Sequence, residues 1–312
     1  MTRPRVVCLV GPTASGKTDL ALELAESAGA EIVSADSRQV YRHLDIGTAK
    51  PTPAERRRVP HHCLDVVDPD ERFDAARFRA AASSVLAEVA ARGGPGLVVG
   101  GTGLWVRVLL RGLCPAPAAV PAVRAALHAL AGRCGVEELH RCLAVIDPPA
   151  AARIRPRDAV RLVRALEVAF SSGRRLSAWQ AAHAFGDAPY EVLLLGLALP
   201  SPELDARIAA RAHGMVAAGF GDEVAALRAR VGDDAPAWAS VGYREMRAYV
   251  DGTSSLGDAL AATVLATRRF AKRQRTWFRA EAGILWRHPV ADRARIMAEA
   301  RVFLVRGERP AA

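Results

Sequence analysis

A short glycine-rich segment near the start of the chain has the residue types and spacing of a phosphate-binding loop. The sequence GPTASGKT at 11–18 fits the pattern G-x-x-x-x-G-K-[ST] without a mismatch. Glycines let successive backbone N–H groups turn toward one anion, and a following helix adds the partial positive charge of its N-terminus. Lys17 would add a full charge, and the Thr18 hydroxyl is placed to hold Mg²⁺. The pattern predicts a site for a di- or triphosphate that is formed by Gly11, Pro12, Thr13, Ala14, Ser15, Gly16, Lys17 and Thr18.

A carboxylate follows the next short apolar run. Asp36 lies in the segment VSADSRQ, directly after Glu31–Ser34. A carboxylate beside a phosphate loop could complete the ligand shell of Mg²⁺, or it could act as a general base on an acceptor nucleophile. An Asp in a turn also commonly accepts hydrogen bonds from its own backbone. The residues alone leave these three roles open.

A third apolar run, Gly96–Val99, ends in Gly100, Gly101 and Thr102 with no carboxylate. P-loop ATPases and GTPases commonly carry an Asp at the end of the matching strand, where it helps to hold Mg²⁺. The lack of an acid there counts against a motor ATPase or a GTPase. A kinase or another transferase that handles pyrophosphate stays possible.

The segment 268–279, RRFAKRQRTWFR, is strongly basic and has no acidic residue. On a helix, positions 268, 272, 275 and 279 form one stripe, and positions 270, 274 and 277 form another. A basic stripe beside aromatic residues is typical of contact with a nucleic-acid backbone, although a solvated basic face over buried aromatics has the same pattern. A second basic run has arginines at 153, 155, 157, 161 and 164. Two basic surfaces favour a long polyanion over a small nucleotide.

The composition agrees with an anionic partner, because the 312-residue chain has a formal net charge of +10. No apolar stretch reaches the length of a membrane span, and the apolar run at 6–10 is too short for a signal peptide, so we expect a cytoplasmic protein. Five cysteines without CxxC spacing predict free thiols, and HHC at 61–63 predicts a structural role rather than a metal site. Only three of the 43 basic residues are lysines, which marks Lys17, Lys50 and Lys272 as positions that need a compact charge.

The elements that must position these residues alternate between strand and helix in the first part of the chain. Apolar runs and periodicity predict, in order, a strand at 6–10, a helix at 18–25, a strand at 31–34, a helix at 73–91 and a strand at 96–99. This alternation predicts an α/β fold with a parallel sheet, and the carboxyl ends of its strands meet at one rim. Segments 11–18, 34–39 and 100–102 should therefore lie together.

The pattern changes at the Pro-rich segment CPAP, 114–117, after which only helical periodicity is found to about residue 184. We expect a P-loop core in two parts, 1–114 and 189–312, with an inserted all-helical subdomain at 115–188. The second part of the core should be mainly helical and carry basic helices. Its predicted elements are a strand at 191–197, helices at 203–218, 220–231, 239–250 and 257–280, a short strand at 284–286 and a helix at 291–304. The fold class is thus a P-loop NTPase-like parallel sheet with an inserted helical subdomain and a helical C-terminal part.

Taken together, the motifs resemble those of the bacterial tRNA dimethylallyltransferases, also called tRNA isopentenyltransferases. The matching segments keep the family's order over nearly the whole chain: GPTASGKT at 11–18, SADSRQVYRHLDIGTAKPT at 34–52, HHCLDVVDP at 61–69, LVVGGTGLWV at 97–106, RPRDAVRLVRALEV at 155–168, SVGYREM at 240–246 and RRFAKRQRTWFR at 268–279. The resemblance implies transfer of a dimethylallyl group from dimethylallyl diphosphate to tRNA, with release of diphosphate. The acceptor would be the exocyclic amine of the adenosine 3′-adjacent to the anticodon, and Mg²⁺ would be the cofactor.

The resemblance also implies that the inserted subdomain 115–188 binds tRNA and that the basic helices of 189–312 contact it. It further implies roles for individual residues. Asp36 would be the general base toward the adenine amine, Thr102 would shape the base pocket, and Lys17 would stabilise the departing diphosphate. Arg207 and Arg211 match a helix near the diphosphate. The implied tRNA contacts are Asp36, Ser37, Arg38, Gln39, Thr102, Arg124, Val160, Arg161, Leu162, Val163, Arg164, Ser240, Val241, Gly242, Tyr243, Arg244, Glu245, Lys272, Arg273, Gln274, Arg275, Thr276, Trp277, Phe278 and Arg279.

Three other functions use the same phosphate loop. A P-loop nucleotide kinase does not account for the helical insert or for the basic segment 268–279. An isopentenyltransferase that acts on free adenine nucleotides would keep the site but would need no platform for tRNA. A nucleotide-switched RNA-binding protein would need hydrolysis, which the acid-free strand at 96–99 does not favour. We expect a monomer, because no exposed apolar helix stands out in the sequence.

Overall fold

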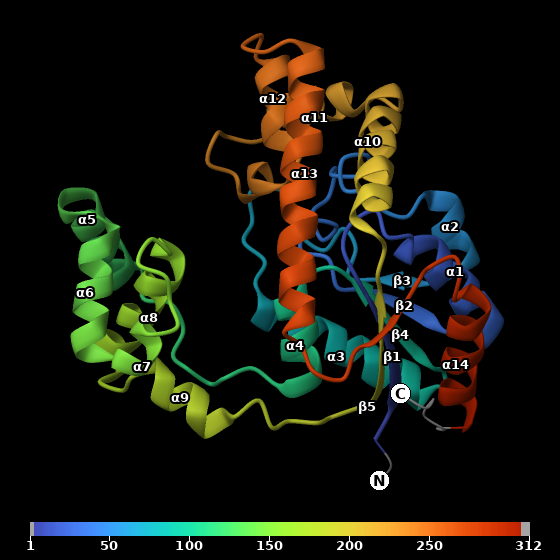
Figure 1. Ribbon diagram of the computed structural model, residues 1–312, viewed down its shortest axis with the longest axis horizontal. Coiled ribbons are helices and arrows are strands. Elements are labelled where there is room, and N and C mark those ends of the chain that lie inside the picture. The colour runs from blue at the N-terminus through green and yellow to red at the C-terminus, as the bar shows by residue number, and fades with distance from the viewer. Residues whose placement is uncertain (1–2, 307–312) are drawn as a thin grey trace. The chain divides into compact units, whose positions relative to one another are not determined.

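A six-stranded parallel sheet forms the centre of the computed structural model, which describes residues 3–306 (Figure 1). The strands are β1 (Arg5–Val10), β2 (Glu31–Ser34), β3 (His61–His62), β4 (Gly96–Gly100), β5 (Glu191–Leu197) and β6 (Leu285–Arg287), in the order β3-β2-β4-β1-β5-β6. Every neighbouring pair is parallel. The predicted α/β class is confirmed. His61 and His62 form the edge strand β3, so these two adjacent histidines have a structural role.

Strand β1 is buried on both sides, which explains its uninterrupted apolar sequence. Val7 and Leu9 pack into one hydrophobic cluster with α1 (Lys17–Ala28) and α14 (Arg293–Arg306). Val6 and Cys8 point the opposite way, as successive strand residues do, and join a second cluster with α3 (Ala75–Ala91) and α4 (Gly103–Arg111). Helices on both faces of a parallel sheet are the arrangement that the alternating sequence predicted.

Four longer helices of the second part of the chain pack together beside the sheet, as Figure 1 shows in yellow and orange. They are α10 (Ser201–Ala217), α11 (Phe220–Arg228), α12 (Tyr243–Val250) and α13 (Leu256–Arg279). The predicted helices are confirmed here, except that α12 begins only at Tyr243. The segment before it forms a short 3₁₀ helix, η1 (Pro236–Ala239), and a turn in which Gly242 has φ of 93°. Two helices were not predicted, α4 and the short α2 (Pro53–Arg58).

The chain separates into two compact units by its internal contacts. One unit contains the residues up to Leu110 and from Ala188 onward, and the other is Arg111–Asp187. The second unit is built from α5 (Pro121–Cys134), α6 (Val136–Ile146), α7 (Pro148–Ala151), α8 (Ala159–Ser172) and α9 (Leu176–His183). Leucines from α5, α6 and α8 form its own hydrophobic core. The insert had been placed at 115–188 from the sequence.

Two general properties concern the described residues as a whole. None of the helices within residues 3–306 combines the length and the apolar character that crossing a membrane requires. All five cysteines are free thiols, as the sequence predicted. Burial raises the pKa of the Cys8 thiol strongly and that of Cys63 to about 11, so neither is a reactive thiolate near neutral pH.

Candidate active site

The carboxyl ends of three neighbouring strands bring the predicted site segments together. Strand β4 lies between β1 and β2, with Gly100 opposite Val10 and Val99 opposite Ser34. The backbone N–H of Thr102 donates to Ala35 O at 3.2 Å. The Thr102 hydroxyl in turn accepts the N–H of Ser37 at 3.0 Å. The expected single rim is therefore confirmed, and Thr102 supports the turn that carries Asp36.

The phosphate loop, Gly11–Thr18, has the backbone that its glycines allow. Gly16 caps α1 in the left-handed conformation, with φ of 85°. The Lys17 ammonium lies along the loop and donates to Gly11 O at 3.0 Å and Pro12 O at 2.6 Å. Desolvation lowers the pKa of Lys17 to about 8, although the Asp36 carboxylate acts in the opposite direction. The Ser15 hydroxyl is buried and has no hydrogen-bond partner among residues 3–306, which suits a polar ligand.

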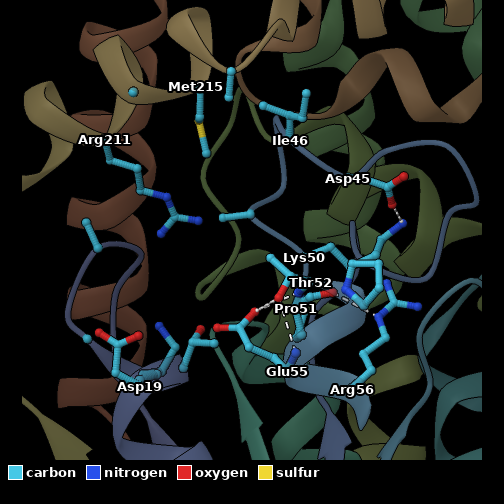
Figure 2. Close-up of a pocket in the computed structure, with 18 of the residues that line it drawn as sticks. Asp19, Asp45, Ile46, Lys50, Pro51, Thr52, Glu55, Arg56, Arg211 and Met215 are labelled. Atoms are coloured by element: carbon cyan, nitrogen blue, oxygen red, sulfur yellow. Dashed lines mark hydrogen bonds and ion pairs between the residues drawn. The ribbon is translucent and has the colours of Figure 1, made fainter. Parts of the chain in front are cut away.

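Two adjoining cavities surround the phosphate loop. The larger, of about 1080 Å³, lies between the loop, α10 and the start of α2 (Figure 2). The smaller, of about 200 Å³, is lined by Asp36, Thr13 and residues of α10 and α13. Both cavities are lined by Lys17, Thr18, Arg211 and Met215. The phosphate loop and the middle of α10 therefore form the boundary between two spaces.

Of the two arginines that the sequence placed near a diphosphate, Arg211 is better positioned. Figure 2 shows its side chain reaching from α10 into the larger cavity, and it also lines the smaller one. Desolvation lowers the pKa of Arg211, while Asp36 and Asp19 act to raise it. Arg207 lines only the larger cavity and pairs with Glu203 at 2.9 Å. Two cations, Lys17 and Arg211, therefore share one space with the Asp36 carboxylate.

Asp36 makes the turn hydrogen bond that the sequence left open, and its side chain also lines a cavity. Its Oδ1 accepts the N–H of Arg38 at 2.8 Å, the local hydrogen bond expected of an Asp in a turn. Its side chain also lines the smaller cavity, within electrostatic reach of both Lys17 and Arg211. The turn thus fixes the orientation of a carboxylate that faces the cavity.

Opposite the phosphate loop, the segment Asp45–Lys50, which we call the wall loop, lines both cavities. It is held by Glu223 on α11, whose carboxylate accepts three consecutive backbone N–H groups, from Asp45 at 2.8 Å, Ile46 at 2.7 Å and Gly47 at 3.0 Å. The Tyr243 hydroxyl donates to the same carboxylate at 2.6 Å. Burial, followed by the neighbouring Glu223, raises the pKa of Tyr243 strongly, so the hydroxyl keeps its proton.

The C-terminal end of the wall loop is fixed by a buried lysine. Lys50 has a side chain only 1% exposed and donates to Tyr41 O at 2.8 Å and to the carboxylates of Asp45 and Asp65, each at 2.6 Å. Arg56 completes the network by pairing with Asp65 at 2.7 Å. The rarity of lysine had singled out Lys50, and a compact charge among three oxygens explains it. Sequence reasoning missed Glu223 and Asp65, which no local pattern marks.

The exposed face of α13 contains Lys272, Arg273, Thr276 and Arg279. Arg275 donates to Ser201 Oγ at 2.7 Å, and Trp277 packs beneath Arg107 with a centroid distance of 4.3 Å. The expected basic surface is therefore present, and Arg273 also lines the smaller cavity.

Several predicted RNA contacts need correction, because their side chains lie in hydrophobic cores. Tyr243 and Phe278 are buried against α11 and the sheet, and Leu162 and Val163 are buried in the core of the helical insert. These four side chains are not available for direct contact with a ligand. Gln274 is also buried and turns inward. The remaining predicted positions in 240–245, namely Ser240, Val241, Gly242, Arg244 and Glu245, surround the N-terminus of α12, and Ser240 has a buried hydroxyl without a partner among residues 3–306.

In the insert, part of the second basic run is neutralised internally. The carboxylate of Glu167 is fully buried and accepts from Arg124 at 2.8 Å, Arg164 at 3.0 Å and the N–H of Val120 at 2.9 Å. Burial acts to raise the pKa of Glu167, but these hydrogen bonds outweigh it and hold the pKa below its ordinary value. Arg161 pairs with Asp158 at the surface. Arg124 and Arg164 therefore have a structural role, whereas Val160 and Arg161 are exposed.

Comparisons with known proteins show which family the chain resembles. A family model described as "IPP transferase" matches residues 39–281, and another described as "Isopentenyl transferase" matches residues 4–66. The chain is 51% identical over 288 residues to a "tRNA dimethylallyltransferase" of Anaeromyxobacter dehalogenans (strain 2CP-C), covering 92% of this chain and 96% of the relative.

Two solved structures are similar over most of the chain. The full-length tRNA isopentenylpyrophosphate transferase of Bacillus halodurans has a TM-score of 0.71 and 37% identity, covering 97% of this chain and 96% of that one. A eukaryotic dimethylallyltransferase acting on tRNA has a TM-score of 0.83 at 23% identity, covering 98% of this chain and 80% of that one, which shows a common fold.

Proposed function

Because this chain belongs to the family of tRNA dimethylallyltransferases, we propose that it transfers a dimethylallyl group from dimethylallyl diphosphate to tRNA. The acceptor is the exocyclic amine of the adenosine 3′-adjacent to the anticodon, and diphosphate is released. One observation supports this most directly: Lys17, Arg211 and Asp36 line the same cavity of about 200 Å³. Two cations suit a departing diphosphate, and a carboxylate suits removal of a proton from an attacking amine.

In the proposed reaction, the bond between the allylic carbon and the diphosphate oxygen breaks as the bond from the adenine nitrogen forms. Negative charge develops on the leaving oxygen, and Lys17, Arg211 and the N–H groups of the phosphate loop stabilise it. Asp36 takes the proton that the amine loses, a step worth about 10²- to 10⁴-fold in rate. Moving the adenine out of a single-stranded loop into the cavity costs on the order of a few kcal/mol.

Mg²⁺ is a further part of the proposal. No group of three or more His, Cys, Asp or Glu side chains within residues 3–306 is arranged to hold a metal ion. The chain would instead supply the Thr18 hydroxyl, and the remaining ligands would be diphosphate oxygens and water, as Mg²⁺ commonly prefers. The ion would neutralise charge on the diphosphate. Calorimetric titration of Mg²⁺ with and without inorganic pyrophosphate would test this fit.

The decisive experiment incubates the protein with radiolabelled dimethylallyl diphosphate and unmodified tRNA. Label in the tRNA, at the adenosine next to the anticodon, is the expected result. Label in a free adenine nucleotide would instead support the nucleotide-specific isopentenyltransferases. Transfer of phosphate from ATP to a small acceptor, with no use of prenyl donors, would support a kinase.

The role of Asp36 is tested by Asp36→Ala. The variant should lose about 10²- to 10⁴-fold in transfer rate and still bind inorganic pyrophosphate, because Lys17 and Arg211 are unchanged. Arg72→Ala, an exposed change outside both cavities, is the control and should keep the rate. A near-normal rate for Asp36→Ala would remove Asp36 as the base.

The basic face of α13 is tested by replacing Arg273 and Arg275 with alanine. The double variant should weaken tRNA binding and make it less dependent on salt, because fewer counterions are released from the RNA. An unchanged salt dependence would assign these arginines a structural role. We also propose that the enzyme acts as a cytoplasmic monomer, which light scattering and fractionation of cells would check.

A further inference from the structure

One buried amide side chain joins three parts of the site. Gln274 is 7% exposed, and its Oε1 accepts the backbone N–H of Thr13, in the phosphate loop, at 2.9 Å. Its Nε2 donates to Gly101 O, in the turn that precedes Thr102, at 3.0 Å. The residue itself belongs to α13. A single side chain therefore contacts the loop for diphosphate, the turn beside Asp36 and the basic helix.

Helix α13 lies in close contact with the turn that carries Thr102. A Cβ added at Gly101 would lie 2.1 Å from Gln274 Nε2, and one added at Gly103 would lie 2.1 Å from Trp277. Trp277 is one turn further along α13, so the helix rests directly on the turn Gly101–Gly103 at two successive levels. A shift of α13 must therefore move this turn, the phosphate loop or both.

The other side of the same helix faces outward and is basic. Lys272 and Arg273 are exposed directly before Gln274 in the chain, and Arg279 is exposed at the C-terminal end of the helix. On the side toward α10, Arg275 donates to Ser201, and Arg268 pairs with Asp205 at 3.7 Å. Helix α10 also carries Arg211, and the phosphate loop carries Lys17. The two elements that supply cations to the smaller cavity are therefore both in contact with α13.

We propose that Gln274 is a positioning residue that couples RNA binding on α13 to diphosphate binding in the phosphate loop. The proposal rests on the proposed function, in which the outer face of α13 contacts tRNA. RNA that holds α13 in place fixes Gln274, and Gln274 then fixes the Thr13 N–H and the adjoining loop in the conformation that binds diphosphate. By linkage, diphosphate must strengthen RNA binding by the same factor. Two neutral hydrogen bonds support a coupling of about tenfold, which corresponds to 1.4 kcal/mol.

The test measures the affinity of inorganic pyrophosphate by calorimetry, with and without a saturating unmodified anticodon stem-loop RNA. For the wild-type protein, the RNA should lower the dissociation constant about tenfold. In Gln274→Met, which keeps the volume but has no amide, the ratio of the two constants should fall close to one. Gln274→Glu keeps the acceptor for Thr13 N–H but loses the donor to Gly101 O, so its ratio should fall as well.

The matched control is Tyr190→Phe, which removes a tertiary hydrogen bond from Tyr190 Oη to Ser83 Oγ (3.2 Å) outside both cavities. A purely structural role for Gln274 would lower thermal stability and leave the ratio of the constants unchanged, as expected for Tyr190→Phe. The Glu variant decides the matter if the Met variant does not fold.

The outcomes separate the coupling from the proposed function. If wild-type protein binds pyrophosphate and prenylates tRNA, but RNA does not alter pyrophosphate affinity, the coupling is wrong and the function stands. A full tenfold ratio in both Gln274 variants also overturns the coupling. If tRNA is not a substrate, the proposed function fails and the coupling fails with it.

Discussion

The phosphate loop and the wall loop face the same two cavities, but they are held in different ways. The phosphate loop, Gly11–Thr18, takes its shape mainly from its own glycines and from the strand and helix at its two ends, with a side-chain contact from Gln274 to the Thr13 N–H. The wall loop, Asp45–Lys50, forms turns of its own, with hydrogen bonds from Ala49 N–H to Ile46 O at 2.9 Å and from Lys50 N–H to Asp45 O at 3.0 Å. It is held further by several contacts with Glu223, Tyr243 and Asp65, which come from elsewhere in the chain.

This difference separates binding from stability. Lys17 is held in a poorly solvated position, where its charge would serve the proposed diphosphate and contributes little to folding. The charged groups of Lys50 and Glu223 are instead paired or hydrogen-bonded with other groups of the protein. Changes in the phosphate loop should therefore cost activity at nearly constant stability, and changes around the wall loop should cost stability first.

The largest effect is expected for Lys17→Met. Loss of one cation at the developing negative charge should lower kcat/KM for dimethylallyl diphosphate by about 10²- to 10³-fold. Because the folded protein desolvates this ammonium, its removal should not lower the free energy of unfolding. Steady-state kinetics and urea unfolding check both parts. A loss of stability without a loss of activity would contradict the assignment of the phosphate loop to binding rather than to stability.

Glu223→Gln should act mainly on stability. The amide leaves at least one of four donors without its charged acceptor, and each such loss costs about 1–3 kcal/mol. Urea unfolding measures the change, and a raised KM for the donor should accompany it as the wall loop loosens. Asp222→Asn, the exposed neighbour on α11, is the matched control and should stay within about 0.5 kcal/mol of wild type. Equal effects of the two changes would remove Glu223 as the support of the loop.

Lys50→Met should lower the free energy of unfolding by about 1.5–3 kcal/mol, the usual cost of losing hydrogen bonds to charged groups. The cost stays moderate because Asp65 keeps Arg56 and Asp45 is largely exposed. The matched change Arg57→Met, at an exposed cation of α2, should have almost no effect. Thermal unfolding of the two variants side by side would distinguish a buried support from a surface charge.

The smallest expected effect is a dependence on pH that comes from Lys17 in the phosphate loop. Since the pKa of Lys17 is lowered to about 8, donor kcat/KM should fall above pH 8, by at most tenfold for each further pH unit. The contribution of Lys17 to the free energy of unfolding should change in the opposite direction. Between pH 8 and 10.5 the unfolded chain binds more protons at Lys17 than the folded one, so its contribution to stability rises with pH. A pH profile of pyrophosphate binding that is flat from 7 to 9.5 would contradict the assignment.

The sequence predicted the parts of the site that local spacing determines. The phosphate loop, the strand ends at Asp36 and Thr102, and the parallel sheet all follow from short motifs and the alternation of strand and helix. Helix α4 was missed because Gly103–Arg111 directly follows the glycine-rich end of β4 and has no helical start signal beyond the glycine turn.

Long-range contacts could not be predicted, because they leave no local pattern. Glu223 and Gln274 look like ordinary polar residues of amphipathic helices. In α13, the sequence placed positions 270, 274 and 277 on one stripe, and the structure buries Ala271, Gln274 and Phe278. Gln274 therefore lies on the inner side as that stripe predicted, whereas Phe270 and Trp277 are only partly buried. Successive residues of a helix are about 100° apart, so a stripe assigned from spacing alone can be one residue off.

The boundary between the two cavities has a consequence for inhibitor discovery. The larger cavity is lined by Arg42, Glu55 and Arg56 on the side away from Asp36, while α13 borders only the smaller one. A compound that fills the larger space and reaches Lys17 would compete with the prenyl donor and leave the RNA side open. Compounds selected in this way could be recognised by competitive kinetics against the donor and non-competitive kinetics against tRNA.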